Sequence, residues 1–241
     1  ANAHEQTRTI PLQHSAKAMK PDGTFKKKRG IIVVDDHPLF RKGVVQMLTS
    51  ESDLEVRAEA ESSPAALELM RTTPVDLAIV DIGLHGSANG IELTKSIKAE
   101  HPHLPVLVLS MHDESLYADR ALRAGASGYL MKREALDSVI VAVRTVLQGE
   151  IYVSAEMSKR MIAEHVGAGG QARSDVDKLT DRELEVLQLI GEGKEVRNIA
   201  EQLHLSAKTV EAHRSHIKEK LNMTNAREVA RFAVQWVDRQ R

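Results

Sequence analysis

The strongest constraint in this sequence is a set of four short apolar runs, each of which ends on a polar side chain. The runs occupy residues 31–34, 77–80, 106–109 and 128–131. Continuous β-branched runs separated by helical patterns are typical of buried parallel strands, whose ligands bind beyond the carboxyl ends of the strands. We therefore expect the polar residues that end the runs to meet at one rim of a sheet. These residues are Asp35, Asp36, Asp81, Ser110 and Lys132.

Strand and helix patterns alternate throughout residues 30–149. The predicted strands are 31–34, 55–60, 76–81, 105–110 and 127–131, and the predicted helices are about 38–49, 63–71, 90–100, 114–123 and 134–148. Five such units predict an α/β domain with a doubly wound, five-stranded parallel sheet.

The pattern of residues 150–241 predicts a linker followed by a helical domain. Residues 150–177 hold a short helical pattern and then a run of small and polar residues, which is typical of a linker. Residues 178–241 carry helical periodicity only, in four helices, with capping-box spacing at Thr180 and Glu183 and a plausible N-cap at Ser206. The short turn between the second and third helices predicts a helix-turn-helix.

The amino-acid composition and the placement of charge limit the kinds of protein that this chain can be. The chain has no cysteine, which excludes disulfides and thiolate chemistry, and no apolar stretch of transmembrane length, so we expect a soluble cytoplasmic protein that does not bind membranes. Residues 1–29 end in four basic residues and read as a disordered basic leader. Residues 171–241 carry 13 basic and 12 acidic residues, so any nucleic-acid binding must depend on where the cations lie.

The polar residues at the rim of the predicted sheet suit metal binding and phosphoryl transfer. Three converging carboxylates repel one another and favour a hard divalent cation, of which Mg²⁺ fits best because it combines a few carboxylates with water and phosphate oxygens. A carboxylate can attack phosphorus to give an acyl phosphate. The transferred phosphoryl group then needs a fixed cation and a hydroxyl donor, which Lys132 and Ser110 supply.

Four separate motifs in residues 30–149 resemble the receiver domain of bacterial two-component response regulators, which implies a flavodoxin-like fold. They are Val34 to Arg41 (VDDHPLFR), Asp81, Ser110, and Gly125 to Lys132 (GASGYLMK). The resemblance implies that Asp81 is the phosphoacceptor and Lys132 binds its phosphate. It also implies a switch pair and a metal site. The switch pair is Ser110 and Tyr129, and the metal ligands are Asp36, Asp81, the Gly83 carbonyl and, through water, Asp35.

The helical domain closely resembles the LuxR-type helix-turn-helix, and joined to a receiver it looks like a NarL/FixJ-class response regulator. The motifs lie at 179–187, 199–203 and 206–221. The resemblance implies that the helix over 206–221 enters the DNA major groove. Its expected base-reading residues are Glu211, Ala212 and Ser215, and its expected phosphate contacts are Lys208, Thr209, His213, Arg214 and Lys218. For Glu211, an ordinary surface charge near Lys208 or Arg214 is an equal alternative.

The expected function is transcription regulation controlled by phosphorylation of Asp81, with no enzymatic activity beyond self-phosphorylation and autodephosphorylation. The expected partners are a sensor histidine kinase, promoter DNA and a second copy of the phosphorylated chain, with RNA polymerase as a further candidate.

Two alternatives remain open. The family usually has proline and glycine where this chain has His85 and Asn89, with Gly90 one residue later, and this departure favours the alternative of a pseudo-receiver that needs no phosphate. An aspartate-nucleophile phosphatase would need an acid at the position of Gly83.

Overall fold

Five parallel strands form one sheet in the order β2-β1-β3-β4-β5. The computed structural model describes residues 27–84, 89–111, 114–165 and 175–238. The strands are β1 (Arg29–Val34), β2 (Leu54–Ala60), β3 (Leu77–Asp81), β4 (Val106–Ser110) and β5 (Gly128–Met131). This strand order is that of flavodoxin-like doubly wound folds, so the predicted fold class is confirmed.

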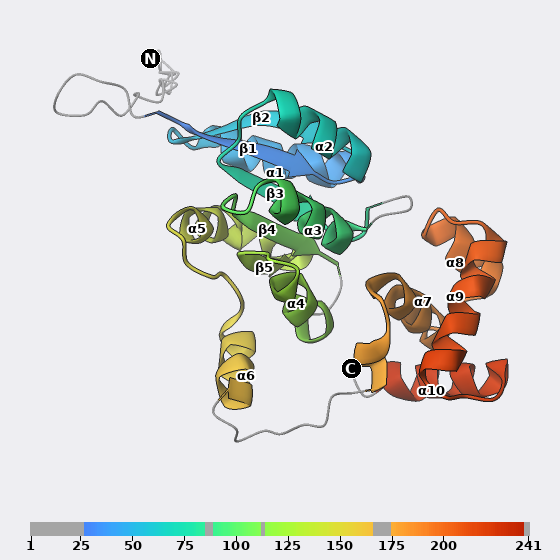
Figure 1. Cartoon of the computed structure of the whole chain (residues 1–241). Helices are drawn as coiled ribbons and strands as arrows, with labels where there is room; N and C mark the ends of the chain where they lie inside the picture. The colour runs from blue at the N-terminus through green and yellow to red at the C-terminus, as the bar shows by residue number, and fades with distance from the viewer. Residues whose placement is uncertain (1–26, 85–88, 112–113, 166–174, 239–241) are drawn as a thin grey trace, which may run out of the picture.

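Helices cover both faces of the sheet (Figure 1). They are α1 (Pro38–Ser50), α2 (Ser63–Thr72), α3 (Gly90–Glu100), α4 (Glu114–Arg123) and α5 (Ala135–Leu147). Because successive strand residues point to opposite faces, Ile31 and Val33 pack with α1 and α5, whereas Ile32 and Val34 pack with α2, α3 and α4. Both faces of β1 are therefore buried, which explains its uninterrupted apolar run.

The chain after α5 stays attached to the sheet. Tyr152 forms a parallel bridge with Gly128 at the β5 edge: the Tyr129 amide donates to the Tyr152 carbonyl at 2.8 Å, and the Tyr152 amide donates to the Ser127 carbonyl at 3.1 Å. The expected short helix follows as α6 (Ala155–His165). Its start is fixed to the sheet domain by the Ser154 amide, which donates to Glu114 at 2.8 Å.

The second domain consists of helices. After the 3₁₀ helix η2 (Asp175–Lys178) come α7 (Asp181–Gly191), α8 (Val196–Gln202), α9 (Ala207–Lys220) and α10 (Ala226–Asp238). The predicted capping box is present. The Thr180 side chain accepts a hydrogen bond from the Glu183 amide, and the Glu183 side chain accepts one from the Thr180 amide. Ser206 caps α9 as predicted, accepting from the Thr209 amide at 3.0 Å.

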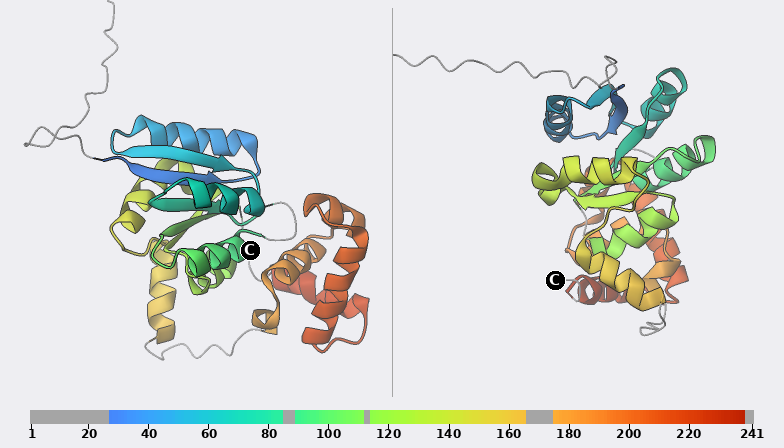
Figure 2. Two further views of the ribbon diagram at one scale, coloured as in Figure 1. Left: turned by 45° about the horizontal axis from the view of Figure 1, so that its top comes forward. Right: turned by 90° about the vertical axis from the view of Figure 1, so that its left-hand side faces the viewer.

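The helical domain lies at the end of the sheet where the strands finish, beside α3 and α4 (Figure 2). The apolar cluster on the α2, α3 and α4 side of the sheet includes buried residues of the helical domain, among them Val176 and Leu179. The two domains therefore share a continuous core on this side. No helix within the described ranges is long and apolar enough to cross a membrane.

The first residue of α3 is a glycine that lies directly against β3. Residues 85–88, which include His85, lie outside the described residues, and Asn89 is the N-cap of α3. The Asn89 side-chain oxygen accepts from the amides of Ile91 and Glu92, each at 3.1 Å. A β-carbon on Gly90 would lie 1.9 Å from the Asp81 carbonyl oxygen. Glycine is therefore required at position 90.

We expect Gly90→Ala to destabilise the protein by about 1–3 kcal/mol or more, because the clash is with backbone and cannot be relieved by a side-chain rotation. Gly43→Ala in α1 is the matched control, since a β-carbon there would meet nothing within 4 Å. That control should stabilise by about 0.5–1 kcal/mol through helix propensity. Urea unfolding measures both. Equal stability of the two variants would contradict the close approach of Gly90 to β3.

Candidate functional site

The sheet register brings the predicted rim residues together. Asp81 is the last residue of β3 and pairs with Leu109, and the next residue of β4, Ser110, pairs with Met131 at the end of β5. Asp35 follows β1 directly and lies 2% exposed, as does Asp81, while Ser110 is fully buried. The acid pair, the lone aspartate, the serine and Lys132 therefore occupy the carboxyl ends of four strands, as the sequence predicts.

Lys132 joins two of the carboxylates. Its Nζ lies 2.8 Å from Asp35 Oδ2 and 2.8 Å from Asp81 Oδ2, and it lies 4.6 Å from the centre of the Phe40 ring. The Lys132 side chain is 3% exposed. Charged hydrogen bonds of this kind gain strength away from water, so the ammonium fixes the relative positions of β1 and β3 at the rim.

Asp36 has a different neighbour. Its Oδ1 lies 2.7 Å from Nδ1 of His37, which also lies 3.9 Å from Asp81 Oδ2. The His37 amide donates to Asp35 Oδ1 at 2.8 Å, so the turn after β1 orients both acids toward Asp81. A β-carbon on Gly83 would lie 3.5 Å from Asp81 Oδ2, which leaves the backbone at Gly83 close to the same carboxylate.

The donor set fits a hard divalent cation. Single ligand atoms of Asp35, Asp36, His37 and Asp81 lie within 4.8 Å of one another. The pKa of Asp81 is raised above its usual value, mainly by burial. The Lys132 ammonium opposes this increase, and the nearby Asp35 carboxylate adds to it. When ionised, the three carboxylates and one ammonium carry a formal charge of −2, which a divalent ion would neutralise, and carboxylate oxygens are the ligands that Mg²⁺ prefers.

The helical domain faces this rim. A cavity of about 290 Å³ opens between them, with His37, Asp81, Gly83 and Met111 on the sheet side. On the other side it is lined by residues of α7 and of the α8 end, namely Glu185, Gln188, Leu189, Gln202, Leu203 and His204. The Asp81 carboxylate thus lies at the contact between the two domains.

A polar network holds the domains together. Asn89 Nδ2 donates to Glu185 Oε1 at 2.9 Å, and the Glu185 side chain is 2% exposed. Arg120 of α4 donates to the carbonyls of Val176 and Leu179, each at 2.8 Å, and lies 3.1 Å from Asp181.

Two further side-chain contacts join the same elements. Lys95 of α3 lies 3.4 Å from the other oxygen of Asp181. The Tyr117 hydroxyl of α4 donates to Gln188 at 3.4 Å, and burial raises the pKa of Tyr117 well above its usual value. The start of α7 is therefore held by both α3 and α4.

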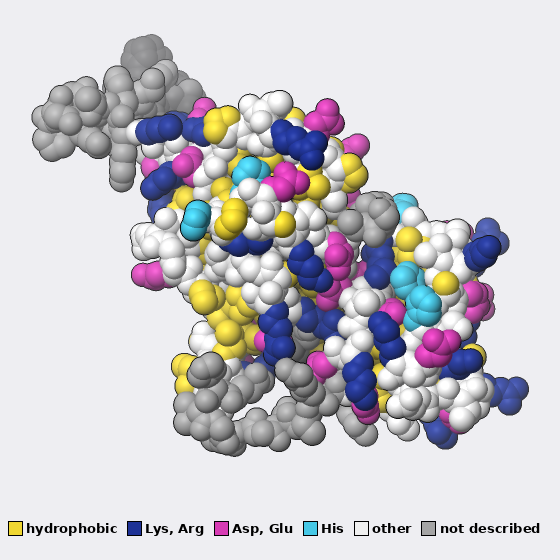
Figure 3. Space-filling model, viewed as in Figure 1, with side chains coloured by type: hydrophobic (Ala, Val, Ile, Leu, Met, Phe, Trp, Pro, Cys, Tyr) yellow, Lys and Arg dark blue, Asp and Glu magenta, His cyan; other side chains and the backbone are white. Residues whose placement is uncertain are grey.

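Helix α9 presents the predicted DNA-contact residues. Val210 and Ile217 are fully buried against the domain, while Lys208, Glu211, Ala212 and Ser215 are exposed. Arg214, His213, Thr209 and Lys218 are half-buried. Arg214 Nη1 lies 2.8 Å from Glu211 Oε1, so these two residues form an ion pair on the helix surface. Figure 3 shows cations and acids interspersed over the helical domain, in keeping with its balanced charge.

Comparison with known proteins decides the family. Residues 31–144 match the response regulator receiver domain, and residues 177–233 match the bacterial regulatory proteins of the luxR family. The transcriptional regulatory protein DegU of Brevibacillus brevis is 37% identical over 214 residues, which cover 83% of this chain and 90% of that protein. The chain is a two-component response regulator of the NarL/FixJ class. It is a regulator of transcription rather than an enzyme in the ordinary sense.

Other relatives agree with this family. The response regulator is 36% identical to the oxygen regulatory protein NreC of Staphylococcus carnosus, over 85% of this chain and 96% of that one. A structure of the RcsB response regulator of Salmonella typhimurium superposes with a TM-score of 0.60 at 26% identity, covering 87% of this chain and 98% of that one. RcsB bound to a promoter in the presence of the phosphomimetic BeF₃⁻ gives a TM-score of 0.53 at 26% identity, over 86% and 100% of the two chains.

The sequence reasoning missed the residues of the interdomain network. In the sequence, Asn89 stands out only as a departure from the family pattern, although asparagine before a helical pattern is a recognisable N-cap signal. Glu185 and Asp181 look like ordinary helix-surface acids in the sequence. No local signal could have placed them opposite Asn89 and Arg120, because these contacts join residues 61 to 96 positions apart.

We expect Lys132→Met to destabilise the response regulator by about 3–5 kcal/mol at neutral pH, because two buried carboxylates lose their cation. Burial already raises the pKa of Asp81, and without Lys132 to lower it this pKa should rise further, so the loss should shrink as the pH falls and Asp81 takes up a proton. Arg133→Met is the control, since that neighbouring side chain is 68% exposed. Urea unfolding at several pH values measures the effect, and a pH-independent loss would contradict this electrostatic cause.

Proposed function

We propose that Asp81 accepts a phosphoryl group from a sensor histidine kinase and that this controls DNA binding by residues 178–241. The observation that carries the proposal is the joining of Asp81 and Asp35 by the buried Lys132 ammonium, with Asp36 beside them. On this reading residues 30–149 form the receiver, 150–177 the linker and 178–241 the DNA-binding domain.

Each residue of the rim has a role in the transfer. The Asp81 carboxylate attacks phosphorus, and an acyl phosphate forms as the bond from phosphorus to the donor breaks. Lys132 and Ser110 bind the peripheral phosphoryl oxygens. Asp36, Asp81 and the Gly83 carbonyl would hold Mg²⁺, with Asp35 acting through water. When bound, this ion neutralises charge on the transferring phosphoryl group.

The charge state of Asp81 would be transmitted by Ser110 and Tyr129. A phosphoryl group adds acceptor oxygens that attract the Ser110 hydroxyl, so Tyr129 can take the vacated space and bias an existing two-state equilibrium. Tyr129 and Tyr117 are both buried, and Tyr129 is near enough to contribute to the raised pKa of Tyr117. Tyr117 in turn contacts Gln188 of α7, which supports a path from the rim to the helical domain.

The active form would be a dimer on promoter DNA. The structures of RcsB include one described as two dimers bound to two parallel DNAs, which supports a dimeric arrangement here. Two half-sites would lie about one helical turn apart, roughly 10 base pairs centre to centre. The proposed base-reading residues are Glu211, Ala212 and Ser215, and RNA polymerase is a further candidate partner.

We expect acetyl phosphate with Mg²⁺ to add one phosphoryl group to the full chain, detected as a mass shift. Asp81→Asn should abolish it, and Asp36→Ala should abolish it by removing a metal ligand, with Asp35→Ala weakening it less. Asp137→Asn is the matched control, because Asp137 is an exposed acid of α5. Labelling that persists in Asp81→Asn would refute the assignment.

The pseudo-receiver alternative has its own test. If the receiver works without phosphate, beryllofluoride with Mg²⁺ should leave the NMR spectrum of the wild-type protein unchanged. If Asp81 is the phosphoacceptor, the same reagent should perturb signals near Ser110 and Tyr129. The phosphatase alternative would require turnover of phosphate esters, which the glycine at position 83 disfavours.

We expect Lys208→Ala and Lys218→Ala to weaken binding about equally on specific and scrambled duplexes, each reducing the slope of log affinity against log salt by about 1. Glu211→Ala or Ser215→Ala should instead relax preference at one base pair by roughly 1–3 kcal/mol. Lys42→Ala, on the exposed surface of α1, should change neither quantity. Loss of specificity in Lys218→Ala rather than Glu211→Ala would show that the reading face is assigned wrongly.

A further inference from the structure

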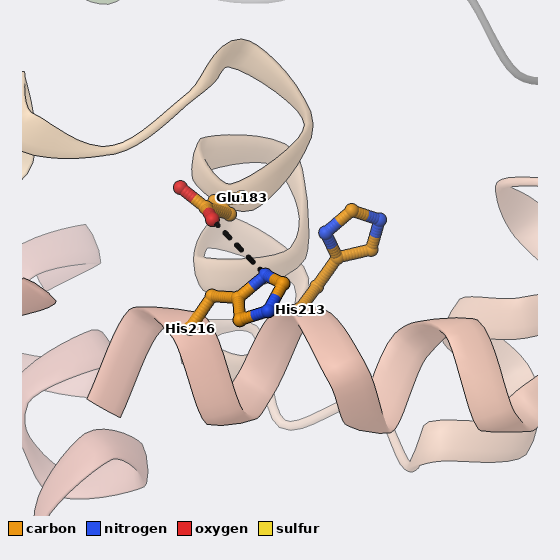
Figure 4. A group of neighbouring side chains, drawn as sticks. All are labelled: Glu183, His213 and His216. Atoms are coloured by element: carbon orange, nitrogen blue, oxygen red, sulfur yellow. Dashed lines mark ion pairs between the residues drawn. The ribbon is translucent and has the colours of Figure 1, made fainter. Parts of the chain in front are cut away.

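Two histidines and a glutamate gather where α9 crosses α7, away from the receiver rim. One ligand atom from each of Glu183, His213 and His216 lies within 4.8 Å of the other two. Figure 4 shows the His216 ring beside the Glu183 carboxylate, with the His213 ring one turn along the same helix. Residues three apart on a helix share a face, so both rings come from the side of α9 that meets α7.

The carboxylate in this cluster is rigidly held. Glu183 is 3% exposed, and its Oε2 accepts from the Thr180 amide at 2.8 Å and lies 2.7 Å from Lys220 Nζ. The other oxygen, Oε1, lies 3.6 Å from His216 Nδ1, which is beyond a normal hydrogen bond. Glu183 thus keeps one oxygen directed at the histidines while the other closes the capping box.

His213 supplies an unsatisfied ligand atom. Its Nδ1 is buried and has no hydrogen-bond partner among the described residues. Burial lowers the pKa of His213, while the Glu183 carboxylate opposes this change. A neutral imidazole has one nitrogen with a free lone pair, which can bind a metal ion. A buried polar atom without a partner in a folded protein calls for an explanation such as an ion.

We propose that Glu183, His213 and His216 bind a divalent transition-metal ion, with Zn²⁺ as the ion best suited to the site. Two imidazoles and one carboxylate form a known zinc ligand set that leaves a fourth position open to water. Imidazole nitrogen selects against Mg²⁺ and Ca²⁺, which take oxygen ligands, so this site differs in kind from the carboxylate rim.

Binding requires a modest local adjustment. Zinc lies about 2.0–2.2 Å from nitrogen and oxygen ligands, so tetrahedral ligands are roughly 3.3–3.6 Å apart and the cluster must contract. The His216 side chain is 58% exposed and can turn inward without disturbing the core. The Lys220 ammonium beside Glu183 opposes a second cation, which sets the affinity below that of a site without this lysine. The ion would tie α9 to α7.

The experiment must separate this site from the receiver rim, where His37 and three aspartates are also grouped. The full chain carrying Asp36→Asn and Asp81→Asn therefore serves as the background. Titration with ZnCl₂ by calorimetry should show one bound ion, and Co²⁺ in its place should give the intense visible absorption of a tetrahedral nitrogen and oxygen site.

His216→Gln in this background should weaken zinc binding at least about tenfold, since even changes outside the ligand shell cost 10–100-fold. It should also remove the increase in melting temperature that zinc produces. His103→Gln, an exposed receiver histidine, is the matched control and should bind as the background does. Lys220→Met should tighten binding. Equal binding by His216→Gln and His103→Gln, or weaker binding by Lys220→Met, would overturn the proposal.

Discussion

The rim of the sheet depends on one ammonium group. Lys132 follows β5, yet its Nζ reaches carboxylates at the ends of β1 and β3, although β4 lies between β5 and β3 in the sheet. Two acids on adjacent buried strand ends would repel each other strongly without a cation in this low-dielectric position. The relative positions of Asp81, Asp35 and Lys132 therefore depend on this interaction.

The carboxylate proposed to react and the contact between the two domains lie at the same end of the sheet. Asp81 ends β3, and Gly90, the first residue of α3, lies directly against the Asp81 backbone carbonyl. The cap of that helix contacts Glu185 of α7, while α4 contacts the segment that leads into α7 through Arg120. Asp81 is thus close to the contact between the two domains, because the helix that follows β3 is capped by a residue that hydrogen-bonds Glu185.

The fold and most of the rim could be predicted from local sequence. Apolar runs specify buried strands, and the parallel order brings their ends together, so Asp35, Asp81 and Lys132 meet as expected. The capping box at Thr180 and the cap at Ser206 were readable for the same reason, because each depends on residues three apart. Two contacts could not be predicted from local sequence, because they depend on how distant elements pack. They are the ion pair of Lys132 with Asp35 in addition to Asp81, and the approach of Glu183 to His216.

Asn89 shows how the identity of one side chain links a helix cap to the domain contact. A side-chain amide is both acceptor and donor: its oxygen caps α3 while its nitrogen donates to the buried Glu185 carboxylate. An aspartate could cap the helix equally well, but it has no proton to donate at neutral pH and would set a second negative charge against Glu185. The loss of a single amide group, with no change of shape, would therefore turn an attraction between the two domains into a repulsion.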